Sequence, residues 1–227
     1  MRRALATAFW IAAAALPLGA GEIPGAVLVL EAVPGTPGSD PAGAPPRFVL
    51  LKDARVFVGG TSHVEAGRLE KGEAQALQKR VSALRKIPGL GSPVSFGGGA
   101  ELPLRLRLLE GEPLEIVATG LPQGDAPVPP ALAELARLLQ ELARFHHASL
   151  RPYAPTSFSL RVREAQLAGG CRSWSLPFPI AEALAGPRAV AAADAASWPT
   201  GAMPASVCVA ERRYAVTLRP LLPGETP

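Results

Sequence analysis

Histidines, the residues that most often carry metal and acid–base chemistry, are scarce in this chain. It has three, His63, His146 and His147. His146 and His147 are adjacent, so on a helix they would point about 100° apart and could not form the i, i+4 pair that holds one ion. We therefore expect no metal site and no cofactor. The pair is better explained as polar residues at the end of a helix, where a cationic imidazole also suits the helix dipole.

No motif for nucleophilic catalysis is present. The chain contains no GxSxG, SxxK or HExxH pattern. Ser62 and His63 are neighbours, but the members of a catalytic triad meet in space rather than in sequence. The glycine run 95–100 lacks the lysine of a phosphate-binding loop and is expected to be a connection. Two carboxylates far apart in the sequence could still form a glycosidase pair, so no catalytic residue is assigned and enzyme activity stays open.

Two cysteines, Cys171 and Cys208, are the only ones in the chain. An even number in an exported protein predicts a disulfide, which for a loop of this size would stabilise the fold by about 4 kcal/mol. The alternative is two buried free thiols in a cytosolic protein.

Six arginines occupy the polar positions or the ends of predicted strands. If those strands share one sheet, the guanidinium groups would line one face and bind an anionic partner. The alternative is a solvated antiparallel face on which the positive charges are scattered among glutamates. The six residues are Arg105, Arg107, Arg161, Arg163, Arg213 and Arg219.

The composition places the chain among folded proteins. It has 227 residues, of which 48% are hydrophobic and 19% charged, so extensive disorder is excluded. The 25 prolines and 23 glycines exclude a long-helix or coiled-coil protein and require many loops.

The first twenty residues have the pattern of a signal peptide. Arg2 and Arg3 precede an apolar run, 4–16, and Pro17 and small residues follow. The run is shorter than the roughly 20 residues of a membrane span, so we expect cleavage and a periplasmic or secreted protein; the alternative is a retained anchor. Cleavage would remove two of the 23 basic residues and leave a net charge of +2, so no nucleic-acid partner is expected.

Hydrophobic periodicity predicts the elements that would position these residues. Two helices are expected from apolar residues at helical spacing, at 72–87 and 130–147, with a short third at 180–185. Strands are expected at 26–33, 47–51, 55–60, 63–69, 102–108, 113–119, 158–163, 206–210 and 214–218. The predicted fold class is α+β, a mainly antiparallel sheet with two principal helices packed on one face. The predicted domains are the signal peptide 1–20, an N-terminal strand with a Pro/Gly-rich linker at 21–46, and the α+β domain 47–227.

The end of the chain resembles a known group of sequences. Tyr214–Pro223, YAVTLRPLLP, followed by Gly224 and Glu225, is similar to the tail of a group of uncharacterised secreted bacterial proteins with an RPLLPDE-like motif. Gly224 replaces the usual acid, and the Asp-Gly turn after the first strand is absent. Shorter similarities extend the resemblance to about 47–225: the strand around Phe48, the helix at Glu73 and the segment 151–155. The resemblance implies secretion and supplies no catalytic residue.

The expected function is therefore a non-catalytic binding or structural module of the cell envelope. Its partner, an envelope or extracellular component, is unknown, and the arginines favour an anionic one. The alternative is a secreted hydrolase whose site is assembled only in three dimensions. A hydrolase should show a nucleophile beside a histidine, or converging carboxylates with perturbed pKa values, in a concave pocket. A binding module should show an exposed apolar or arginine-rich face.

Overall fold

The computed structural model describes residues 23–33, 44–60, 63–88, 90, 93–96, 103–121, 128–165, 167, 169–201 and 203–227. The predicted signal peptide and residues 34–43 of the predicted linker lie outside this part of the chain. None of the described helices is long and apolar enough to span a membrane.

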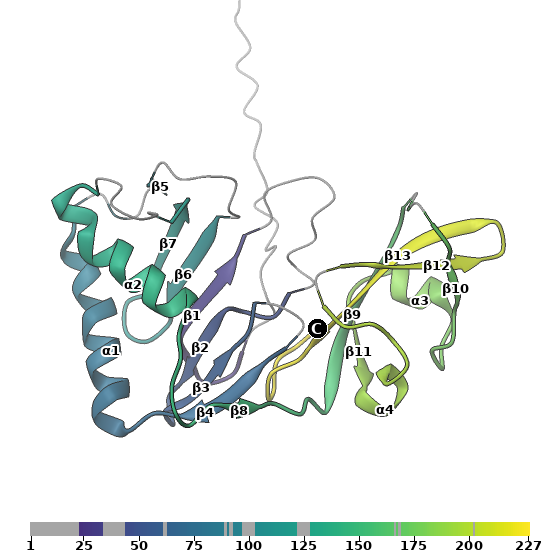
Figure 1. Cartoon of the computed structure of the whole chain (residues 1–227), viewed down its shortest axis with the longest axis horizontal. Helices are drawn as coiled ribbons and strands as arrows, with labels where there is room; N and C mark the ends of the chain where they lie inside the picture. Colours follow the sequence, from purple (N-terminus) through teal and green to yellow (C-terminus); the bar gives the residue numbers. More distant parts are fainter. Residues whose placement is uncertain are drawn as a thin grey trace, which may run out of the picture.

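The fold is α+β and is built on two sheets (Figure 1). The larger sheet has eight strands in the order β5-β7-β6-β1-β2-β3-β4-β8. Neighbouring strands in this sheet pair antiparallel, except β5 and β7, which are parallel. The strands are β1 (Ala26–Ala32), β2 (Phe48–Leu51), β3 (Arg55–Val58), β4 (Glu65–Arg68), β5 (Val94–Ser95), β6 (Leu104–Leu108), β7 (Leu114–Thr119) and β8 (Arg151–Pro152).

Two principal helices cover one face of this larger sheet, as predicted (Figure 1). They are α1 (Lys71–Ala83), which continues into a 3-10 turn at Leu84–Lys86, and α2 (Ala133–Ala143), which follows a 3-10 turn at Pro130–Leu132. Leu77 and Val81 of α1 and Leu138 of α2 are buried against alternate strand residues, such as Leu106 of β6. Apolar residues at helical spacing on α1 and α2 therefore pack against alternate residues of the strands to form the main core.

The smaller sheet has five strands in the order β10-β12-β13-β9-β11. Two short helices, α3 (Ile180–Leu184) and α4 (Ala192–Ala195), belong to the same part of the chain, and its core contains Leu160, Leu218 and Trp198. The predicted disulfide between Cys171 and Cys208 is confirmed; it joins the start of β10 to β12. The strands are β9 (Ser157–Glu164), β10 (Arg172–Ser173), β11 (Arg188–Ala191), β12 (Ala205–Val209) and β13 (Arg212–Pro220).

The C-terminal residues connect the two sheets. Leu222 is buried in a third apolar cluster with Val29, Val49 and Phe57, on the face of the larger sheet away from the helices. The tail motif thus forms most of β13 in the smaller sheet, and its last residues cover the larger sheet.

The sequence predicted most of these elements, but it placed the end of the second helix too late. The helix ends at Ala143 rather than near His147. The chain then turns so that the Phe145 ring packs edge-on against Phe48 of β2, with ring centroids 4.9 Å apart. His146 and His147 therefore lie beyond the helix.

Candidate functional site

The six arginines proposed as one anion-binding face are divided between the two sheets. Arg105 and Arg107 lie on β6 of the larger sheet, and Arg161, Arg163, Arg213 and Arg219 lie on β9 and β13 of the smaller one. The six therefore do not share one sheet, and the predicted single face is wrong.

Arg105 and Arg107 are matched by carboxylates. Both project from β6 on the face away from the helices, beside the buried Glu31 of β1. Glu31 Oε1 lies 3.3 Å from Arg107 Nε and 3.8 Å from Arg105 Nη1, and Glu115 Oε1 lies 3.5 Å from Arg105 Nε. Two carboxylates thus face two guanidinium groups, so these two of the six arginines offer little net charge to a ligand.

Arg213 and Arg219 hold the protein's own backbone or side chains. The Arg213 guanidinium donates through Nη1 to the carbonyl oxygens of Leu167 and Gly169, at 2.7 and 2.8 Å. Arg219 is 1% exposed, and its Nη2 lies 2.7 Å from Oε1 of the equally buried Glu225. A ligand could not reach Arg219 without opening the fold.

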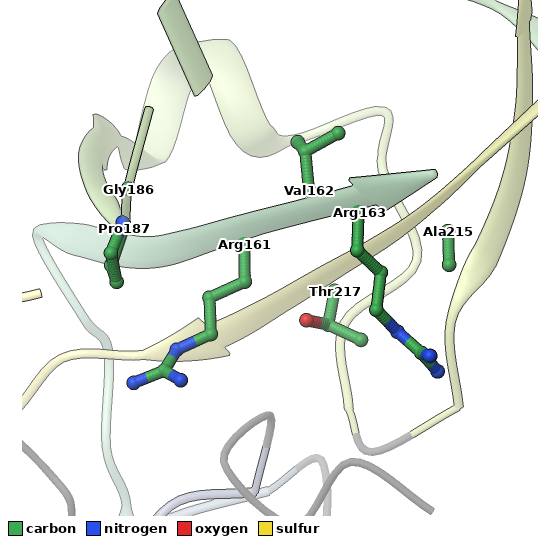
Figure 2. Close-up of a pocket in the computed structure, with 7 residues that line it drawn as sticks. All are labelled: Arg161, Val162, Arg163, Gly186, Pro187, Ala215 and Thr217. Carbon is green, nitrogen blue, oxygen red and sulfur yellow. The ribbon is translucent and has the colours of Figure 1, made fainter. Parts of the chain in front are cut away.

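Arg161 and Arg163 remain on an accessible surface. They are alternate residues of β9 and so project from the same face, opposite Thr217 and Ala215 of β13 in the strand register. Figure 2 shows both side chains on one side of β9, with Val162 on the other side. Arg161 is half-buried and Arg163 is exposed.

These two arginines line a cavity of about 220 Å³. Ala215 and Thr217 contribute small side chains to its wall. A Cβ at Gly186 would meet no atom within 4 Å, so the space beside Gly186 is open. None of the described lining residues is acidic. In Figure 2 the two guanidinium groups point away from one another, with Thr217 between them. We call Arg161, Arg163 and Thr217 the arginine face.

Among the described residues, Ser149, His147 and Glu73 most resemble a serine–histidine–acid triad. Ser149 was not a candidate from the sequence. Its Oγ lies 2.8 Å from Nδ1 of His147, and Nε2 of His147 lies 3.4 Å from Oε2 of Glu73. No sequence motif could have found it, because Glu73 comes from α1 and the other two follow α2.

Ser149 is nevertheless directed at the backbone of β4. Its Oγ accepts the Arg68 N–H at 3.0 Å, and a Cβ added at Gly67 would lie 2.5 Å from that oxygen. Glu73 Oε2 in turn accepts the Glu70 N–H at the start of α1. The neighbouring cavity of about 210 Å³ is lined by Glu73 and His147 but not by Ser149. The Ser149–Arg68 hydrogen bond therefore connects the chain after α2 to β4, and the approach of His147 to Glu73 brings it beside α1.

His63, the third histidine, lies apart from this cluster, in a larger cavity between the two sheets. Among the described residues, no group of three histidine, cysteine or acidic side chains is arranged to hold a metal ion.

Comparisons of the chain with protein-family models, with curated proteins and with solved structures gave no match. The similarity of the tail to a group of secreted bacterial proteins therefore stays a prediction.

Proposed function

We propose that this protein is a non-catalytic binding module of the cell envelope and that it holds an anionic polymer on its arginine face. The observation that carries the proposal is the pair Arg161 and Arg163, which projects from one face of β9 into a cavity with no acidic lining residue among those described. A guanidinium group offers up to five N–H donors and binds carboxylates and phosphates in a forked geometry.

A polymer fits this face better than a single small anion. Alternate residues of a strand are roughly 7 Å apart, and the two guanidinium groups point away from one another (Figure 2). They cannot close on one phosphate or carboxylate together. They suit a ligand that carries successive charges along its length.

The disulfide and the serine geometry support the other parts of the proposal. A disulfide is typical of proteins in oxidising compartments outside the cytoplasm, which agrees with the predicted signal peptide. The Ser149 oxygen faces the β4 backbone rather than the neighbouring cavity, which disfavours the alternative of a hydrolase.

The test replaces Arg161 and Arg163 with glutamine and measures binding to long-chain polyphosphate and to inorganic phosphate at equal phosphate concentration. The control, Arg137→Gln with Arg212→Gln, removes the same charge from two exposed positions elsewhere. We expect the wild type and the control to bind the polymer, and the Arg161/Arg163 variant to bind it at least about tenfold more weakly. Inorganic phosphate should bind poorly to all three.

Two results would contradict the proposal. Equal loss in the control variant would mean that total charge, and not this face, determines binding. Failure of the wild type to bind polyphosphate, or another polyanion such as polyglutamate, at low salt would remove the function itself.

A further inference from the structure

A second cavity lies where the two sheets meet, and we call it the junction cavity. Its volume is about 550 Å³, within the range of roughly 300–1,000 Å³ that is usual for small-molecule sites. It is lined by residues of β3 and β4 in the larger sheet, by the segment that follows β8, and by the ends of β9 and β13 in the smaller sheet. The cavity beside the arginine face is smaller, at about 220 Å³.

Two aromatic rings and three prolines form part of the wall of the junction cavity. Tyr153 and Phe158 contribute the rings, and Pro152, Pro155 and Pro220 contribute rigid apolar surface. The Tyr153 ring is held edge-on to Phe57, with centroids 5.4 Å apart, and its hydroxyl donates to the Leu221 carbonyl at 3.1 Å. These contacts fix the position of the ring at the edge of the cavity.

Glu65 makes the cavity acidic. It is the only carboxylate among the described lining residues, none of which is lysine or arginine. The other described lining side chains with polar groups are His63, Thr200 and Tyr153, whose hydroxyl is bonded to the Leu221 carbonyl. Elsewhere in the described chain, Asp53, Glu31, Glu115, Glu134, Glu141, Glu164, Glu182 and Glu225 each lie within 4 Å of an arginine nitrogen. Among the residues that the structure describes, no such ion pair involves Glu65, although the chain as a whole has a net charge of +4.

We propose that the junction cavity binds an organic ammonium group, with Glu65 as its counter-ion and Tyr153 and Phe158 as its aromatic neighbours. This site is distinct from the arginine face and does not depend on the function proposed for it. Aromatic rings attract cations through their quadrupole, and alkylammonium ions keep an apolar surface that packs against prolines. A neutral ligand of the same shape would use the apolar walls but would gain nothing from the carboxylate.

The experiment compares three probes of similar size on the full chain. Choline is the quaternary ammonium probe, ethanolamine is the primary one, and 3,3-dimethylbutan-1-ol is the neutral isostere of choline. Binding is followed by NMR, through the ring resonances of Tyr153 and Phe158, up to about 10 mM probe. Comparison of choline with ethanolamine distinguishes a quaternary from a primary ammonium source.

Two variants and one control assign the site. Glu65→Gln removes the charge from an exposed position and should leave the fold intact. Phe158→Leu removes the ring but keeps apolar volume. Glu211→Gln, in the exposed turn between β12 and β13, removes the same charge away from the cavity.

We expect at least one ammonium probe to bind about tenfold more tightly than the neutral isostere. Glu65→Gln should remove that preference, Phe158→Leu should weaken ammonium binding more than isostere binding, and Glu211→Gln should change neither. Equal affinity for choline and the isostere would overturn the proposal, as would an unchanged preference in Glu65→Gln. Absence of any ring shift with both ammonium probes would also overturn it. Loss of polyphosphate binding bears only on the arginine face.

Discussion

Arg219 and Glu225 form a buried ion pair, a contact with a high desolvation cost. An arginine that is 1% exposed has lost its hydration, and only a well-placed partner offsets that cost. Glu225 supplies it: Oε1 lies 2.7 Å from Arg219 Nη2, and Oε2 accepts the Leu222 N–H at 2.9 Å. These interactions explain why the tail motif combines an arginine, two leucines and an acid.

Glu225→Gln should therefore be strongly destabilising. It keeps the shape of the side chain but leaves the buried Arg219 without its counter-charge, and we expect the free energy of unfolding to fall by about 3 kcal/mol. Urea denaturation measures the change. Glu164→Gln is the control, because Glu164 and Arg212 are exposed and 3.9 Å apart, so its effect should stay below about 0.5 kcal/mol. Similar effects of the two substitutions would refute the role given to the buried pair.

Ala210 has a backbone conformation that suits glycine. It lies in the turn between Val209 and Arg212, which are paired in the ladder of β12 and β13, and its φ is 53°. Alanine at positive φ costs about 1 kcal/mol, and Gly is the usual residue at the first position of such hairpin turns. We expect Ala210→Gly to raise the free energy of unfolding by up to about 1 kcal/mol, measured by urea denaturation.

Ala54, at φ 65°, provides the comparison for that turn. Its side chain packs against the main core, so glycine there would relieve strain but lose apolar contact. The gain from Ala54→Gly should be smaller than the gain from Ala210→Gly. A decrease in stability for Ala210→Gly would show that the turn is not strained.

At the scale of elements, the disulfide anchors β10, a strand too short to be stabilised by its own ladder hydrogen bonds. β10 has two residues and pairs parallel with β12 at the edge of the smaller sheet. Two residues form few ladder hydrogen bonds, so the Cys171–Cys208 bond supplies a covalent link between the start of β10 and its partner strand β12.

Replacing both cysteines with alanine should loosen the smaller sheet selectively. The bond closes a loop with a sequence separation of 37 residues, for which we expect a loss of about 3 to 4 kcal/mol. Amide hydrogen exchange should accelerate in β10 and β12 and remain slow in β1 and β2 of the larger sheet. Uniform acceleration over both sheets would indicate that they unfold as one unit.

Local sequence patterns predicted the elements that have enough residues to show a period. Leucines alternating with Arg105 and Arg107 predicted β6, and alternation around Arg161 predicted β9. The pairs of residues in β5, β8 and β10 are too short to carry a period. Membership of a sheet is also not a local property, because β6 and β9 show the same alternation in different sheets. For that reason the sequence proposed six arginines for one face, whereas the structure leaves Arg161 and Arg163 together on an accessible cavity.

At the scale of the whole molecule, one short segment connects the sheets and borders the junction cavity. The tail after β13 buries Leu222 under the larger sheet, and the Tyr153 hydroxyl donates to the neighbouring Leu221 carbonyl. Tyr153 also packs against Phe57 of β3. The relative placement of the two sheets, and hence the shape of the cavity between them, depends on these contacts.

Tyr153→Phe should test this connection through pH. Burial raises the pKa of the Tyr153 phenol above its usual value near 10, and the Glu225 carboxylate raises it further. A raised folded-state pKa means that the stabilisation is complete below the unfolded-state pKa and is lost as the pH rises through the folded-state value. At neutral pH the variant should be less stable by about 1 kcal/mol, because the hydrogen bond to Leu221 is missing. Urea midpoints measured at about pH 8 and pH 11 should show the gap between wild type and variant shrinking in alkali. A gap that stays constant over this range would mean that the phenol remains accessible to solvent and does not hold the sheets together.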